Sequence, residues 1–224
     1  MTALAQPMSP TTLLESTIAK KVVMALTGVV LFGFSLVHVA GHFIAFKGAD
    51  AYNAYAHTLK ASAAVLWGAR SFLLVSVALH IWAALTLTAS NNAARPLGYR
   101  ATANEASTYA SRTMKWGGPL LFFFIVYHLL HFTIGSAHGS FIADDAYHNL
   151  VTGFANPVVV AFYLLSMIAL GLHLSHGFAS MLQTLGLSHP SYNPLRKVAS
   201  VAFGAIVCLA YCVFPIAVFA GLLK

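Results

Sequence analysis

Residues 22–46 form a long apolar run that holds no charged side chain and yet carries two histidines, His38 and His42, near its far end. A helix needs about 20 apolar residues to cross a bilayer, so this run is long enough to span one. An imidazole in hydrocarbon raises the free energy unless a partner satisfies it. A histidine inside such a span therefore indicates a functional site, and its partner has to be sought in other spans.

The rest of the chain shares this apolar character. Of its 224 residues, 59% are hydrophobic and only 8% are charged, which is too little charge to cover a soluble globule. We predict an all-α integral membrane protein with a polar N-terminal segment over residues 1–19 and a single transmembrane domain over residues 20–224. The five predicted spans are residues 22–46, 63–89, 117–135, 157–182 and 198–222, and the first four are expected to form a bundle.

The net charge of +7 does not indicate a nucleic-acid partner, because the basic residues are spread thinly at the ends of the hydrophobic runs. Eight of the twelve flank the predicted inner ends of the spans: Lys20, Lys21, Arg95, Arg100, Arg112, Lys115, Arg196 and Lys197. The first connection has only Lys47 and Lys60. The connection over residues 136–156 has no lysine or arginine and carries Asp144 and Asp145. Since loops rich in lysine and arginine stay in the cytoplasm, the N-terminus is predicted inside and the C-terminus outside. The basic connection over residues 90–115 is then the expected docking surface for a soluble partner.

The first run is too long for the core of a signal peptide, so we expect an uncleaved first span. The fifth span carries no histidine and is expected to flank the bundle without supplying a ligand. Its two cysteines, Cys208 and Cys212, lie four residues apart, and a disulfide within one helix is geometrically implausible. We therefore predict two free thiols.

Four spans each carry a histidine: His38, His80, His128 and His173. Six-coordinate haem iron takes two axial imidazoles from opposite faces, so two helices must supply them at one depth. With a rise of 1.5 Å per residue, His38 lies about 25 Å and His128 about 20 Å from the basic residues that precede their spans. Both therefore belong to the outer half of the membrane, whereas His80 and His173 belong to the middle or inner half. We predict two haems b, an outer one on His38 and His128 and an inner one on His80 and His173.

Further polar residues lie close to the predicted ligands. His42, His131 and His176 stand three or four residues from a ligand, on nearly the same helix face, so each could replace it. We interpret them as partners of a propionate, of a quinone or of a ligand, and His42 and His131 as candidate donors to a quinone carbonyl. Arg70, about two turns inside the second span, either reaches outward to the surface or neutralises a haem propionate.

Several segments together resemble a known family. They are KKVVMALTG, LVHVAGH and GADAYNAYAH in and after the first span, NNAAR after the second, YHLLHF in the third and HLSHG in the fourth. This combination resembles the five-helix, di-haem cytochrome b subunit of succinate dehydrogenases and fumarate reductases over residues 20–222. The resemblance implies that one histidine on each of the first four helices ligates haem, namely His38, His80, His128 and His173. Relatives often have asparagine where this chain has His42 and His176.

The resemblance also implies partners and a location. A multi-pass subunit of this kind lies in the bacterial cytoplasmic membrane, in contact with lipid. It binds an iron–sulfur subunit on the cytoplasmic face and a flavoprotein that carries the dicarboxylate chemistry. Electrons then pass between the iron–sulfur clusters, the inner haem, the outer haem and a quinone, often menaquinone. On this resemblance, we expect the chain to be the electron-transfer and quinone-reactive part of an enzyme, with no catalytic residue for succinate itself.

Two other functions remain open at this point. A cytochrome b subunit of a membrane hydrogenase or formate dehydrogenase also uses bis-histidine haems and quinone, and its soluble partners would distinguish it. A histidine-lined transporter of metal ions or protons belongs to a different class. It predicts metal-stimulated transport and no Soret band, and it leaves the matched depths of the histidines unexplained.

Overall fold

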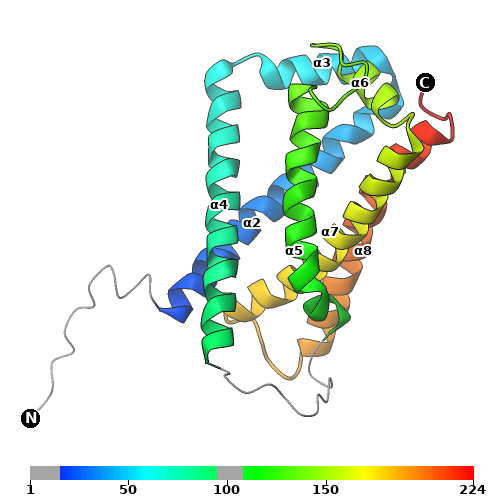
Figure 1. The fold of residues 1–224 in the computed structure, drawn as a ribbon. Helices are drawn as coiled ribbons and strands as arrows, with labels where there is room; N and C mark the ends of the chain where they lie inside the picture. Colours follow the sequence, from blue (N-terminus) through cyan, green and yellow to red (C-terminus); the bar gives the residue numbers. More distant parts are fainter. Residues whose placement is uncertain (1–15, 95–107) are drawn as a thin grey trace, which may run out of the picture.

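A computed structural model describes residues 16–94 and 108–224 (Figure 1). In chain order the elements are α2 (Thr17–His42), the 3₁₀ turn η1 (Phe43–Lys47), α3 (Ala49–Lys60), α4 (Ala63–Ala93), α5 (Tyr109–His128), the π-helical turn η3 (Leu129–Ile134), α6 (Ala146–Gly153), α7 (Pro157–Thr184) and α8 (Asn193–Phe219). The described ranges contain no strand. Most of the predicted polar N-terminal segment and the centre of the predicted docking surface, residues 95–107, lie outside the described residues.

Five of the described helices are long and apolar enough to cross a membrane. They are Thr17–Lys47, Ala63–Ala93, Tyr109–Ile134, Pro157–Thr184 and Asn193–Phe219, and each overlaps one predicted span. Large apolar side chains such as Trp67, Phe123 and Leu209 are exposed on the outside of the bundle. Lipid can cover such a surface because every helix satisfies its own backbone groups. The predicted class, an all-α integral membrane protein, is confirmed.

Polar caps fix where the helices begin. The side-chain oxygens of Ser16, Ser62, Thr108 and Asn156 accept hydrogen bonds from backbone N–H groups in the first turns of α2, α4, α5 and α7. Each bond satisfies a donor that the helix itself leaves free. Thr108 explains why α5 begins well before residue 117, where the apolar run starts. Pro157 follows its cap at the first helical position, where its missing N–H costs nothing.

The fifth membrane helix, α8, is a full member of the bundle and lies along α7 (Figure 1). The two helices cross at Gly171 and Gly204, and a Cβ built on Gly171 would lie 2.9 Å from the carbonyl oxygen of Gly204. Glycine at both positions lets the two backbones touch. On another face, the Tyr211 hydroxyl donates to the carbonyl oxygen of Ser35 in α2 at 2.8 Å. The expectation that this helix only flanks the bundle understates these contacts. Both of its cysteines are free thiols, as predicted.

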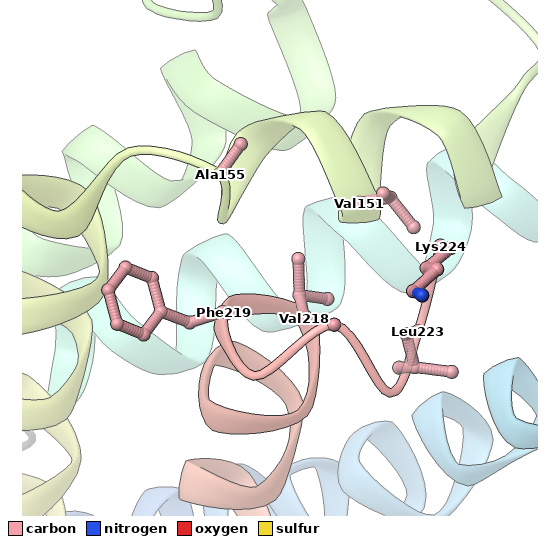
Figure 2. A pocket seen from close by; sticks show the side chains of 7 residues that line it. Val151, Ala155, Val218, Phe219, Leu223 and Lys224 are labelled. Atoms are coloured by element: carbon pink, nitrogen blue, oxygen red, sulfur yellow. The ribbon is translucent and has the colours of Figure 1, made fainter.

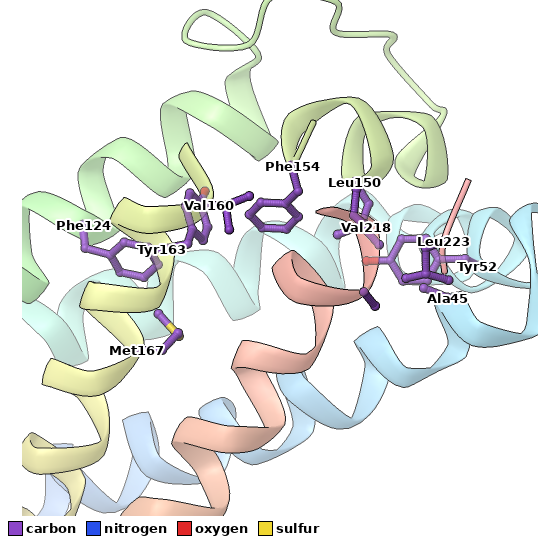
Figure 3. Packing of buried hydrophobic residues seen from close by; sticks show 11 residues of the cluster. Ala45, Tyr52, Phe124, Leu150, Phe154, Val160, Tyr163, Met167, Val218 and Leu223 are labelled. Carbon is purple, nitrogen blue, oxygen red and sulfur yellow. The ribbon is translucent and has the colours of Figure 1, made fainter. Parts of the chain in front are cut away.

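Two short helices, α3 and α6, cover one end of the bundle, which we call the capped end (Figure 1). Tyr52 of α3, Leu150 of α6 and Val218 of α8 are buried together there (Figure 3). The Asn53 side chain joins α3 to α6, since its amide donates to Asp145 at 3.0 Å and its oxygen accepts from the backbone N–H of Tyr147 at 2.9 Å. Helices α2, α5 and α8 begin at the opposite end of the bundle.

A surface hollow also lies at the capped end, between α6 and the last residues of α8 (Figure 2). Its lining consists of Val151, Ala155, Val218, Phe219, Gly221, Leu223 and Lys224. Apart from one lysine this lining is apolar and contains no histidine, so the hollow does not belong to the predicted site.

Replacing Asp145 by alanine should loosen the cap. Its carboxylate caps α6 by accepting from the backbone N–H of His148 at 2.9 Å, and loss of such a cap typically costs about 1 kcal/mol. The bonds from His148 and Asn53 also hold the pKa of Asp145 below its ordinary value of 3.8. A lowered folded pKa means that this stabilisation is present above pH 3.8 and lost as the pH falls through the folded pKa.

Hydrogen exchange of α6 measures this effect. The Asp145→Ala protein should exchange faster than wild type near neutral pH, and the difference should shrink in acid. Asp145→Asn is the control, because it keeps an oxygen acceptor and removes only the titration. Equal exchange in Asp145→Ala and wild type at neutral pH would contradict the capping role.

Candidate functional site

Two pairs of predicted histidine ligands meet inside the bundle. The ring centres of His80 (α4) and His173 (α7) are 6.1 Å apart. Those of His38 (α2) and His128 (α5) are 6.0 Å apart, with the ring planes at 89°. The structure thus brings together the same partners that the depth estimate pairs. Whether these residues ligate haem is not tested by their positions, and that part stays a prediction.

Thr27 of α2 fixes the protonation of His80. Its hydroxyl lies 3.1 Å from His80 Nδ1, and it also lies 2.7 Å from the carbonyl oxygen of Val23 and 3.2 Å from that of Met24. A hydroxyl has one proton, and a threonine in a helix commonly donates it to the carbonyl one turn back, here that of Val23. Nδ1 of His80 must therefore donate to Thr27. The lone pair of His80 is then on Nε2, which is the atom left for a metal.

His173, the other member of this pair, lacks such a hydrogen bond. Nδ1 of His173 is buried and has no hydrogen-bond partner. One turn further along α7, Nε2 of His176 lies 3.3 Å from the hydroxyl of Ser180, four residues on. His176 therefore has a local partner of its own, whereas His173 does not.

A third imidazole, that of His42, contacts the pair nearer the capped end, which is His38 and His128. Nε2 of His42 lies 3.2 Å from Nε2 of His38, and Nδ1 of His42 lies 2.5 Å from the hydroxyl of Tyr52. A hydrogen bond between the two Nε2 atoms uses the lone pair of one and the proton of the other. In either direction Nε2 of His38 is occupied, by the bond or by its own proton, so this bond and a metal on His38 Nε2 exclude each other. His42 is thus in direct contact with a predicted ligand.

Tyr163 of α7 links two histidines of the third membrane helix. Its hydroxyl lies 3.3 Å from Nδ1 of His128 and 3.1 Å from Nδ1 of His131. One phenol can donate to one of these nitrogens and accept from the other, so the tautomers of the two histidines are coupled. His131 is only 2% exposed, and its ring stacks on that of His138 at 4.9 Å.

Arg70 does not approach either pair through any contact in the described residues. Its guanidinium lies over the exposed ring of Trp67, 5.0 Å from the ring centre. Both side chains lie in α4 near the capped end, and His80 is ten residues further along the helix, about 15 Å away. Of the two alternatives for Arg70, this cation–π contact favours the outward one.

The sequence did not single out Thr27 or Tyr163 as site residues. Both have hydroxyls inside apolar runs, and a buried hydroxyl has to find a hydrogen-bond partner. That requirement is a signal in the sequence, but it does not say which histidine the hydroxyl meets. The partners depend on how each helix is rotated about its axis.

The bundle and its imidazole pairs define a polytopic α-helical membrane protein with histidines gathered at two levels of its interior. Residues 91–214 match the family model of the succinate dehydrogenase/fumarate reductase transmembrane subunit. This match covers more than half of the chain, and the chain belongs to that family. His128 and His173 lie inside the matched stretch, whereas His38 and His80 precede it. No curated protein and no solved structure gives a significant match.

Membership of the family establishes the coarse function. The chain is a multi-pass membrane subunit of a succinate dehydrogenase/fumarate reductase complex, and this subunit anchors the catalytic subunits at the membrane. The family is of the cytochrome b type, which suggests haem and quinone as its cofactors.

Proposed function

We propose that this chain carries two haems b, one between His80 and His173 and one between His38 and His128, within a single transmembrane domain. It transfers electrons between the iron–sulfur subunit and a membrane quinone. The iron–sulfur subunit and the flavoprotein dock at the end of the bundle opposite the cap. This end faces the cytoplasm of a bacterium. Six of the described basic residues lie toward that end, in agreement with the positive-inside rule: Lys20, Lys21, Arg112, Lys115, Arg196 and Lys197. Four lie toward the capped end: Lys47, Lys60, Arg70 and Lys224.

The separation of the rings carries this proposal. A metal forms bonds of about 2.0 Å to imidazole nitrogens, and with ~1.1 Å from nitrogen to ring centre, two axial rings on one metal have centres about 6 Å apart. The two pairs measure 6.1 Å and 6.0 Å. The four residues come from four different helices, so each pair clamps its site from two sides.

The donor set also fits haem b. Thr27 leaves His80 Nε2 free as a ligand, and an anchored Nδ1–H of this kind orients a metal-bound imidazole. Bound haem supplies one-electron chemistry at these sites. His38, His80, His128 and His173 would hold the iron, and the surrounding apolar helices would exclude water from it.

We place the quinone at the capped end of the bundle, near His131 and His42. His131 is buried beside Tyr163, which lies at its Nδ1, so its Nε2 can donate to a quinone carbonyl. His42 can do so only if it gives up its contact with His38, because Tyr52 already lies at its other nitrogen. The resemblance in the sequence favours menaquinone.

The test is a pyridine haemochrome assay on the purified complex, followed by a reduced-minus-oxidised spectrum. We expect two haems b per chain, reduced by succinate when the flavoprotein and iron–sulfur subunits co-purify. Reduction by hydrogen or formate, with other soluble subunits present, would instead indicate the hydrogenase or formate dehydrogenase type. A complex without haem would overturn the proposal and would favour a histidine-lined transporter.

A further inference from the structure

The hydroxyl of Tyr163 is buried between two histidines for which different roles are proposed. The side chain is only 5% exposed. Its hydroxyl lies 3.3 Å from Nδ1 of His128, a predicted haem ligand, and 3.1 Å from Nδ1 of His131, a candidate donor to a quinone. The described residues offer this hydroxyl no third hydrogen-bond partner. Its proton and its lone pairs must therefore be divided between the two imidazoles.

Ligation at His128 decides how they are divided. Because Nδ1 of His128 faces the phenol, Nε2 is the atom left for iron, and a nitrogen that binds a metal needs its lone pair. The proton of the neutral imidazole is then on Nδ1, which donates it to Tyr163. The phenol cannot donate its own proton back to that nitrogen, so it donates to Nδ1 of His131. Two hydrogen bonds in series result, from His128 to Tyr163 and from Tyr163 to His131.

This direction fixes the tautomer of His131. Since Nδ1 accepts from the phenol, the neutral ring carries its proton on Nε2. The imidazole of His138, which stacks on His131, cannot accept this proton. Its Nε2 donates to the carbonyl oxygen of Asn149 at 3.0 Å, and its Nδ1 accepts from the backbone N–H of Ser140 at 3.2 Å. Among the described residues, Nε2–H of His131 is thus a donor without an acceptor.

We propose that Tyr163 is a positioning residue for the reaction with quinone. By accepting from His128 and donating to His131, it keeps a proton on Nε2 of His131, where a quinone carbonyl, which can only accept, requires one. This inference rests on the proposed di-haem function and quinone site. It adds to them a residue that touches neither the iron nor the quinone and connects the histidines that do.

The variant Tyr163→Phe should change the redox potential of one haem. An acceptor at Nδ1 makes a ligating imidazole more basic and so favours oxidised iron. Without it, the ratio of reduced to oxidised haem at a fixed potential should rise about threefold at His38 and His128, a midpoint shift of about 28 mV for one electron. The change is modest because the bond of 3.3 Å is long. The haem on His80 and His173 should keep its potential.

The same variant should raise the KM for quinone more than it changes kcat. Phenylalanine offers no donor to Nδ1 of His131, so this imidazole is no longer held in the Nε2–H tautomer. With succinate as the electron donor and a dimethylnaphthoquinone as the acceptor, we expect KM to rise about fivefold and kcat to stay within about twofold, as for the loss of one hydrogen bond used in binding. His131→Leu should also raise KM. Adding Tyr163→Phe to it should raise KM no further, because Tyr163 acts through His131.

Tyr127→Phe is the matched control. The ring of Tyr127 also stacks on that of His131, with ring centres 5.3 Å apart, but its hydroxyl makes no hydrogen bond within the described ranges. This variant should match wild type in both potential and KM. In Tyr163→Phe the ring that packs against Phe124 and Phe154 is retained, so this complex should assemble with both haems.

Redox titration followed by optical and EPR spectra measures the potentials, and the haem absent from His38→Ala identifies the site. Equal potentials or equal KM values in Tyr163→Phe and Tyr127→Phe would overturn the inference and leave the di-haem function standing. If Tyr163→Phe does not assemble, His131→Leu decides, since a wild-type KM in that variant would also overturn the inference. A wild-type complex without haem would overturn the function itself.

Discussion

Replacing His80 or His173 by alanine should remove one haem b from the complex and leave the other in place. Each haem needs two axial imidazoles, and the two rings in question lie 6.1 Å apart on α4 and α7. His176, one turn from His173, is the nearest candidate to replace it, but its Nε2 already has the hydroxyl of Ser180 as a partner at 3.3 Å. The haemochrome assay should therefore report one haem per chain in place of two.

Replacing His38 or His128 should remove the other haem. His42 provides a control, because His42→Asn takes away its contact with His38 and should preserve both haems. If both members of a pair could be replaced without loss of haem, the pairing would be wrong. Loss of a haem in His42→Asn would instead make His42 a ligand, with Tyr52 as the group that orients it.

Gly204→Ala should prevent normal packing of α7 against α8. A Cβ at this position would collide with the backbone carbonyl oxygen of Gly171 and would lie 2.9 Å from the Cβ of Ser175. Backbone atoms cannot move aside as the end of a long side chain can. Overpacking of this kind usually costs about 1–3 kcal/mol, and a clash with the backbone of the neighbouring helix α7 belongs at the upper end. The melting temperature of the detergent-solubilised complex should fall clearly.

Gly33→Ala in α2 is the matched control, since a Cβ there would meet no atom within 4 Å. Alanine favours helix over glycine by roughly 1 kcal/mol, so this variant should be as stable as wild type or slightly more stable. A Gly204→Ala complex that melts together with Gly33→Ala would show that α7 and α8 can separate at no cost.

The sequence predicts well at which depth in the membrane each histidine lies. It predicts poorly how each helix is rotated about its axis. The helical rise alone places His80 opposite His173 and His38 opposite His128, because depth depends only on counting residues from a membrane boundary. The apolar runs likewise predict the five membrane helices, and the family resemblance is confirmed by the match over residues 91–214.

Contacts that depend on the rotation and tilt of each helix could not be predicted in this way. Thr27 meets His80 and Tyr163 meets His128 because particular faces of α2 and α7 point inward. The crossing of α7 and α8 at Gly204 has the same origin. Glycines are common in membrane helices, so the sequence does not say which one lies at a crossing.

The cap over the bundle determines which electron carriers can reach the histidines beneath it. Helices α3 and α6 close the end nearest His38 and His128, with Tyr52, Leu150 and Phe154 buried beneath them (Figure 3). A water-soluble electron carrier arriving along the bundle axis would meet this lid. A carrier dissolved in the bilayer can approach between the long helices, where the surface is apolar. Under the proposed function, the shape of the molecule thus opens the site at His38 and His128 to lipid-soluble carriers and closes it to the aqueous phase.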